Sequence, residues 1–470
     1  MERSTERSME RLTTSEPARL LGSVSGSDQR SDPSTRRTSK RRSDQRREQH
    51  EARRRDEQPA SAARGLPGRG RLVWLLGPAF VAAIAYVDPG NVAANLTAGA
   101  AHGYLLVWVL VLANVMAVLI QYLSAKLGLV TGQTLPSLLG TRLGRRSRLL
   151  FWIQAELVAA ATDLAEVVGG ALALQILFGL PLPAGGLIVG LVSLGLLAVQ
   201  SRRGQRPFEF VVIGLLVVIT IGFTAGLFVS PINWHQASTS LLPRFDGTPT
   251  VLLAASMLGA TVMPHAIYLH SGLAKDRHGS RIARDRIPRL LRASRLDVIL
   301  ALFLAGSVNI AMLLLAAASL PGHGGTDTIQ GAHHAIQTAL GPGVGIIFGI
   351  GLLASGLAST SVGSYAGSTI MAGLLALKIP LIWRRIITLI PALIVLTIGF
   401  DPTRALILSQ VLLSIGVPFA LIPLVAYTSR ATIMGSFANP RPLTIAAWII
   451  TAAIIALNLT LIGLTLTSHR

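Results

Sequence analysis

Long apolar stretches separated by short polar segments dominate the chain from residue 72 onwards. A helix that crosses a membrane needs about 20 mostly apolar residues, and the pattern predicts eleven such helices. The eighth stretch is longer than one span, and its first residues are expected to lie outside the membrane. The pattern therefore predicts an all-α integral membrane protein, with spans at 72–97, 104–130, 149–178, 184–200, 207–229, 250–274, 295–319, 335–375, 381–399, 403–427 and 441–467.

The start of the chain, residues 1–71, forms a second region without apolar periodicity. It contains 18 Lys and Arg and 11 Asp and Glu, and the remaining 399 residues contain only 11 acids. A segment so rich in charge and so poor in aromatic residues cannot bury enough apolar surface to fold. We predict a disordered basic tail, which is not a signal peptide because no short apolar core follows its charges. A solvated extension is favoured over a role in binding lipid or nucleic acid.

The loops between the predicted spans differ in charge. When alternate loops are assigned to opposite sides, 21 Lys and Arg fall on one side and three on the other. Positive residues are concentrated on the cytoplasmic side of membrane proteins. The amino terminus is therefore predicted to be cytoplasmic and the carboxy terminus external, in the inner membrane of a bacterium. The choice of a bacterium rests on the abundance of Ala and the excess of Arg over Lys.

The chain has no cysteine, which excludes disulfides and thiolate ligands. It also has no nucleophile–base motif, phosphate-binding loop or His-Glu-x-x-His pair, so we predict neither an enzyme nor a bound cofactor. A metal site could use only oxygen, imidazole or thioether ligands.

Two predicted spans are interrupted near their centres, at Asp88-Pro89-Gly90-Asn91 and at Met263-Pro264-His265. Proline and glycine break a helix, and broken backbone at membrane depth is tolerated only inside protein or beside a cavity. The breaks fall in spans 1 and 6, which have opposite orientations. This predicts two inverted repeats, 72–230 and 250–427, followed by an extra helix at 441–467. Paired breaks of this kind indicate a transporter binding site.

The two breaks supply an unusual set of ligands. A carboxylate such as Asp88 at the centre of a membrane helix costs about 2.5–3.5 kcal/mol and needs a cation, a proton or a basic partner. Asn91 adds an amide, Met263 a thioether, and Ala85 and Ala260 carbonyls freed by the breaks. A thioether suits Mn²⁺, Fe²⁺ or Co²⁺ better than Mg²⁺ or Ca²⁺. The alternative for Met263 is a flexible apolar filler.

The third span carries three acids, Glu156, Asp163 and Glu166, which lie near one face of a helix. Acids in this position are typical of a proton relay. They could instead form ion pairs with Arg384 and Arg385 at the start of span 9, and the two interpretations are compatible. His265 follows the second break and is a further candidate for proton transfer. His270 is interpreted as a polar cap, and His102, His323, His333 and His334 are predicted to lie in external loops.

The paired break motifs resemble those of the Nramp family of divalent metal–proton symporters. The segments 161–169 and 268–271, Ala366-Gly367 and Leu408-Ser409-Gln410 resemble the same family. The resemblance extends from about residue 72 to the end. It implies a LeuT-type fold and transport of Mn²⁺ or Fe²⁺, with protons and the lipid bilayer as the other partners and no nucleic acid. It implies metal ligation by Asp88, Asn91, Met263, Ala85, Ala260 and, in some states, Gln410. It implies proton movement through Asp88, Asp163 and Glu166, surrounded by His265, Glu156, Arg384 and Arg385.

Three positions depart from the family pattern, because amide residues are replaced by Ala266, Leu357 and Ser368. The direct ligands are unchanged, so metal transport remains the prediction, while gating and ion preference stay open. Two other hypotheses remain. One is a transporter of the same fold for another cation, either Mg²⁺ or an amino acid or organic cation. The other is a membrane sensor.

Overall fold

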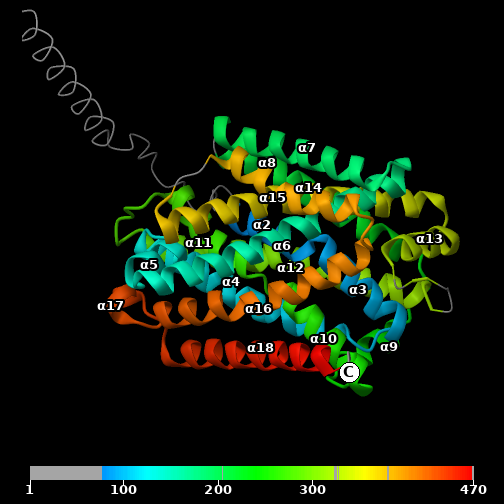
Figure 1. The fold of residues 1–470 in the computed structure, drawn as a ribbon. Coiled ribbons are helices and arrows are strands. Elements are labelled where there is room, and N and C mark those ends of the chain that lie inside the picture. The colour runs from blue at the N-terminus through cyan, green and yellow to red at the C-terminus, as the bar shows by residue number, and fades with distance from the viewer. Residues whose placement is uncertain (1–76, 204, 322–324, 327, 378–379, 468–470) are drawn as a thin grey trace, which may run out of the picture. The chain divides into compact units, whose positions relative to one another are not determined.

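The computed structural model describes residues 77–203, 205–321, 325–326, 328–377 and 380–467 (Figure 1). The tail predicted for residues 1–71 lies outside the described residues. Within them, all regular elements are helical. The fold class predicted from the apolar pattern is therefore confirmed.

The helices follow one another with short connections (Figure 1). In chain order they are α2 (Pro78–Ala83), η2 (Ile84–Val87), α3 (Pro89–His102), α4 (Val107–Thr131), α5 (Leu135–Arg142), α6 (Arg145–Phe178), α7 (Leu182–Arg203), α8 (Gln205–Thr224), η3 (Ala225–Phe228), α9 (Trp234–Thr239), α10 (Gly247–Thr261), α11 (Pro264–His278), α12 (Ile287–Ser319), α13 (Ile329–Leu340), α14 (Pro342–Leu375), α15 (Leu381–Thr397), α16 (Pro402–Thr428), α17 (Ala431–Met434), η4 (Gly435–Phe437) and α18 (Arg441–Thr467).

Nine helical segments in the described part of the chain are long and apolar enough to cross a membrane. The other two of the eleven predicted spans coincide with the broken unit α2–η2–α3 and with α15, which has 17 residues. The apolar pattern did not predict the short helices α5, α9, α13 and α17. His333 and His334 therefore lie in helix α13, contrary to the prediction of a loop, and His102 ends α3.

Both predicted breaks are present, and proline explains each. Pro89 is the first residue of α3 and Pro264 the first residue of α11, where the missing N–H of proline costs nothing. The preceding residues, Asp88 and Met263, have extended backbone, as expected before proline. Each predicted span is therefore two half-helices joined at an extended residue.

The helices that flank the breaks pack closely through small residues. Gly356 of α14 lies against Gly170 of α6, where an added Cβ would come within 2.8 Å of the Gly170 Cα. A methyl group at Gly169 would overlap the ring of Pro89, so α6 also contacts the start of α3. In a membrane, such close approach of backbones drives helix association. It holds α6 and α14 beside the first break.

The last helix, α18, supports α16. Pro418 lies inside α16 and has no N–H for the carbonyl of Ser414, four residues earlier. Asn458 of α18 donates its Nδ2 to that carbonyl at 2.6 Å. A Cβ at Gly259 of α10 would lie 3.0 Å from Ser414 Cβ and 3.6 Å from Asn458 Oδ1. Helix α18 thus supplies the hydrogen-bond donor that Pro418 cannot give to the Ser414 carbonyl, next to α10 of the second broken span.

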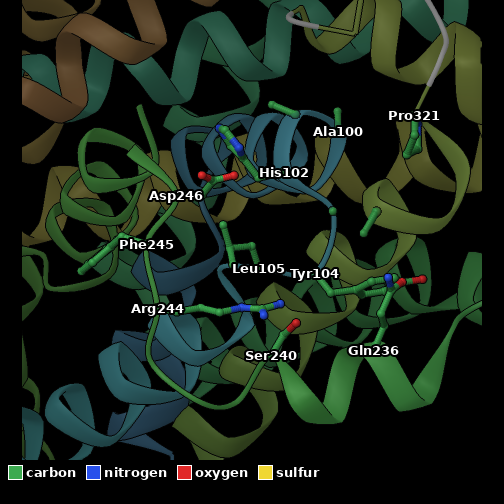
Figure 2. Close-up of a pocket in the computed structure, with 13 residues that line it drawn as sticks. Ala100, His102, Tyr104, Leu105, Gln236, Ser240, Arg244, Phe245, Asp246 and Pro321 are labelled. Atoms are coloured by element: carbon green, nitrogen blue, oxygen red, sulfur yellow. The ribbon is translucent and has the colours of Figure 1, made fainter. Parts of the chain in front are cut away.

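A cavity of about 700 Å³ opens where α3 ends and α10 begins (Figure 2). Its walls come from the end of α3, from α9, from the residues before α10 and from the end of α12. It is separate from the helix breaks, because no residue of either break lines it.

Candidate metal site

Asp88 occupies the first break and caps helix α3. Its Oδ1 accepts hydrogen bonds from the backbone N–H of Asn91 at 2.8 Å and from Asn91 Nδ2 at 2.7 Å. Its side chain is buried, and its Oδ2 has no hydrogen-bond partner within the described part of the chain. An uncompensated carboxylate oxygen in a low-dielectric interior favours a bound cation or proton.

Neighbouring helices stabilise the backbone of the first break. Asn309 of α12 donates its Nδ2 to the carbonyl of Tyr86 at 2.7 Å, and its Oδ1 accepts from Asn95 Nδ2 at 2.9 Å. Ser355 of α14 donates its hydroxyl to the carbonyl of Val87. Two of the carbonyls that precede Asp88 are therefore held in fixed positions. Asn309 and Ser355 were not predicted from the sequence, although a polar residue in an apolar span was a usable signal.

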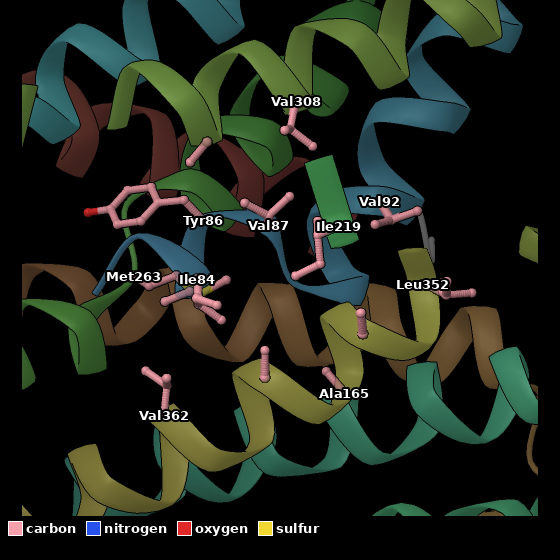
Figure 3. Packing of buried hydrophobic residues seen from close by; sticks show 14 of the residues in the cluster. Ile84, Tyr86, Val87, Val92, Ala165, Ile219, Met263, Val308, Leu352 and Val362 are labelled. Carbon is pink, nitrogen blue, oxygen red and sulfur yellow. The ribbon is translucent and has the colours of Figure 1, made fainter. Parts of the chain in front are cut away.

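The Asn91 amide links the second break to the first. Asn91 Nδ2 donates to the carbonyl of Ala260, at the end of α10, at 3.2 Å, and to Asp88 at the same time. Met263 is fully buried and lies in the same apolar cluster as Ile84 and Ala85 of the first break (Figure 3). The structure therefore brings Asp88, Asn91 and Ala260 together by hydrogen bonds and places Ala85 and Met263 in one cluster.

Gln410 of α16 approaches the first break from a third helix. A methyl group at Gly90 would overlap the Gln410 amide, so the two residues are in direct contact and only glycine fits. Both polar atoms of this buried amide lack a hydrogen-bond partner among the described residues. Gln410 faces inward, whereas Leu408 on the same helix is 59% exposed. A buried amide without partners, beside a carboxylate oxygen without a partner, fits a site that holds an ion.

Among the described residues, no group of three His, Asp or Glu is arranged to hold a metal. An ion at the breaks would therefore be held by one carboxylate together with neutral amide, carbonyl and thioether donors. This set suits a first-row transition metal.

The acids of α6 pair with arginines of α15, as one of the two interpretations expected. Arg384 Nη2 lies 2.7 Å from Glu156 Oε1, and Arg385 Nη1 lies 3.2 Å from Asp163 Oδ1. Arg385 is fully buried and also donates its Nε to Ser193 of α7 at 2.9 Å. The two pairs connect α6 to α15 inside the protein.

Glu166 differs from its two neighbours. It is buried, and neither carboxylate oxygen has a hydrogen-bond partner within the described residues. A Cβ at Gly363 of α14 would lie 3.0 Å from Glu166 Oε2 and 3.4 Å from Asp163 Oδ1. The two carboxylates therefore converge on one glycine, which leaves room for both. Like charges this close repel each other, which makes the pair a candidate proton site.

His265 and His270 are both buried in α11 and have different partners. His265 Nδ1 lies 3.4 Å from Thr162 Oγ1, next to Asp163, and its Nε2 has no partner in the described part of the chain. His270 is not the polar cap that the sequence analysis expected. It donates its Nδ1 to Gln121 Oε1 at 2.8 Å, and Gln121 Nε2 donates to Tyr86 Oη at 2.8 Å. This connection between α11, α4 and the first break was not predicted from the sequence.

The three departures from the family pattern lie in two kinds of environment. Ala266 is fully buried directly after the second break, and Leu357 and Ser368 are half-buried on α14. An apolar residue at position 266 needs no hydrogen-bond partner, so it leaves the second break apolar around Met263. Nothing in the structure assigns a role to Leu357 or Ser368.

A bundle of apolar helices with two paired breaks that meet at buried polar residues is typical of a membrane transporter of the LeuT fold class. The family model described as natural resistance-associated macrophage protein-like, Nramp, matches residues 79–464. The chain belongs to the Nramp family, a family of membrane transporters.

The relatives cover most of the transporter region. The chain is 59% identical to the divalent metal cation transporter MntH of Mycobacterium tuberculosis over 394 residues, which are 84% of this chain and 92% of that protein. It is 44% identical to the protein of the same name from Bacillus subtilis over 401 residues, 85% of this chain and 93% of that protein.

Solved structures agree with the fold. The manganese transporter of Eremococcus coleocola is 30% identical and matches with a TM-score of 0.77, covering 84% of this chain and 87% of that chain. The transporter Mhp1, of the nucleobase-cation-symport-1 family, is 15% identical with a TM-score of 0.55, covering 82% of this chain and 89% of that chain. The second match concerns the fold alone.

Proposed function

We propose that this chain is a proton-coupled importer of divalent transition-metal ions, Mn²⁺ or Fe²⁺, that works by alternating access. The observation that carries the proposal is the Asn91 amide, which contacts the carboxylate of the first break and a carbonyl of the second. One small ion could take the place of the hydrogen bonds that the Asn91 amide donates, and would then contact both breaks. The names of the relatives, divalent metal cation transporter and manganese transporter, support the same cargo.

Each proposed ligand has a distinct part. Asp88 supplies the negative charge, Asn91 and Gln410 supply amide oxygens after rotation of their amides, and Ala85 and Ala260 supply carbonyls. Met263 supplies a thioether, which Ca²⁺ and Mg²⁺ accept poorly because they prefer shells made only of oxygen. The site therefore favours Mn²⁺ or Fe²⁺ over the more abundant hard cations.

Proton movement is proposed through the buried acids beside the metal site. A metal that binds Asp88 displaces a proton held there, since a bound ion favours the ionised carboxylate. Thr162 and His265 link the second break to the region of Asp163, and Glu166 shares the space at Gly363 with Asp163. Arg385 pairs with Asp163 and Arg384 with Glu156, whereas Glu166 forms no ion pair within the described residues, so we propose Glu166 as the acid that takes up the proton.

The membrane orientation is part of the proposal. The division of 21 basic residues against three supports a cytoplasmic amino terminus and an external carboxy terminus, in a bacterial inner membrane. In this orientation α3 and α10 are the external half-helices, and α2 and α11 the cytoplasmic ones. The inverted repeats are proposed to be 72–230 and 250–427.

The test is uptake into proteoliposomes that contain a metal-sensitive dye and a pH dye. Purified protein should carry Mn²⁺ and Fe²⁺ inward with acidification of the lumen, and should discriminate against Ca²⁺ and Mg²⁺. Metal uptake without acidification would refute proton coupling. Inhibition of uptake by amino acids, or equal uptake of Mg²⁺, would favour a different cargo for the same fold.

A further inference from the structure

The cavity beside the external half-helices contains charged side chains that form no ion pair with another described residue. It is lined by the end of α3 with Ala101 and His102, by Gln236 of α9 and by Arg244 and Asp246, which precede α10. Its volume of about 700 Å³ lies in the range of ligand-binding pockets. None of these residues belongs to the break site described above.

His102 and Asp246 occupy equivalent places on the two half-helices. Helix α3 follows Asp88 of the proposed metal site and ends at His102, and α10 follows Asp246 and ends at Thr261, next to Ala260 of that site. Figure 2 shows the imidazole and the carboxylate directed toward the same part of the cavity. No ion pair or hydrogen bond joins these two side chains in the described structure. The near ends of the half-helices meet at Asn91, and the far ends face each other across this cavity.

Charges of both signs surround this position. The last carbonyls of a helix lack intrahelical donors, and the carboxy-terminal end carries about half a negative charge. The end of α3 therefore adds to the negative charge of Asp246, and the amino-terminal end of α10, with about half a positive charge, opposes it. Arg244 lines the same cavity and opposes a cation, but Figure 2 shows its guanidinium directed toward Ser240, away from His102. An imidazole with a carboxylate, completed by water, suits first-row divalent metals.

We propose that His102 and Asp246 form a second metal site, which binds a divalent transition-metal ion from outside and ties the far end of α3 to the start of α10. The choice of ion and the external side rest on the proposed function, but the juxtaposition of the ligands does not. With two protein ligands and an opposing arginine, the site binds more weakly than the site at the breaks. An ion there restrains the two external half-helices relative to each other.

The test is a Mn²⁺ titration of the purified full chain in detergent, in which electron paramagnetic resonance measures free Mn²⁺. The wild-type chain should bind two equivalents, one tight and one weak. Asp88→Ala should retain only the weak one, and the double substitution His102→Ala with Asp246→Asn only the tight one. All three substitutions together should abolish binding.

The control is His235→Ala, which changes an exposed histidine of α9 outside the cavity lining and should leave both equivalents in place. In the Asp88→Ala background, Arg244→Ala should tighten the weak equivalent several-fold because it removes a like charge. Two unchanged equivalents in the His102 and Asp246 double variant would overturn the second site. An unchanged tight equivalent in Asp88→Ala would instead refute the proposed transport site, so the two failures are distinguishable.

Discussion

The two helix breaks have the same local cause and different surroundings. Each places a proline at the first position of a new half-helix after an extended residue. At the first break the extended residue is Asp88, whose side chain caps the next half-helix. At the second break the extended residue is Met263, which makes no capping hydrogen bond and is packed among apolar side chains. The extended residue is therefore a carboxylate at the first break and an apolar methionine at the second.

The breaks also differ in how they are supported. Carbonyls of the first break accept hydrogen bonds from Asn309 of α12 and Ser355 of α14. The Ala260 carbonyl near the second break accepts from Asn91, a residue of the first. A preorganised carboxylate can attract any cation, whereas a thioether distinguishes among cations. We infer that the first break supplies affinity and the second supplies selectivity.

The largest effect is expected from Asp88→Ala. Removing the only carboxylate at the breaks should abolish Mn²⁺ uptake, because neutral ligands alone do not offset the dehydration of a divalent ion. Uptake into proteoliposomes measures this. Asp285→Ala, which alters an exposed acid between α11 and α12, is the matched control and should transport normally. If Asp88→Ala still transports, the first break does not supply the affinity.

The support of the first break is tested by Ser355→Ala and Asn309→Leu. Each leaves a buried carbonyl without its donor, at a cost of about 1–3 kcal/mol. Both variants should melt at lower temperature and transport more slowly than wild type. Ser307→Ala is the control, because that hydroxyl bonds only within its own helix, to the Phe303 carbonyl, at an exposed position. Unchanged melting of both variants would show that these bonds do not hold the break.

A change in selectivity is expected from Met263→Ala. The variant should retain part of the Mn²⁺ uptake, and its preference for Mn²⁺ over Ca²⁺ should fall several-fold. The reason is that the oxygen of a water molecule can take the place of the sulfur ligand. Competition of Ca²⁺ with Mn²⁺ uptake measures this ratio. Met434→Ala, a buried methionine in α17 away from both breaks, should leave the ratio unchanged. An unchanged ratio in Met263→Ala would mean that selectivity arises elsewhere.

The smallest effect is expected from Asn458→Leu, which acts at a distance from the ligands. The substitution removes the hydrogen bond that Asn458 donates to the Ser414 carbonyl. That carbonyl has no donor within its own helix because Pro418 lacks an N–H. We expect a loss of about 1–3 kcal/mol in stability and a modest loss of uptake, with unchanged selectivity. Thermal melting and uptake together check this. A change in the ratio of Ca²⁺ to Mn²⁺ uptake would show that α18 influences the second break directly.

The sequence predicted those features that depend on composition and local chemistry. The apolar stretches predicted the spans, proline predicted both breaks, and three acids in one span indicated the ion pairs with Arg384 and Arg385. Hydrogen bonds between spans depend on helix register and packing, which one sequence does not reveal, so the connection from His270 through Gln121 to Tyr86 was missed. Short helices such as α13 were missed because they lack a long apolar stretch.

One ion is proposed to contact both breaks at once, and X-ray absorption of the purified chain with one equivalent of Co²⁺ tests this directly. Because the chain has no cysteine, a sulfur neighbour of the metal can come only from methionine. We predict one sulfur among oxygen neighbours in the wild-type chain, and its loss in Met263→Ala without loss of the metal. A shell of oxygen and nitrogen alone in the wild-type chain would contradict the account.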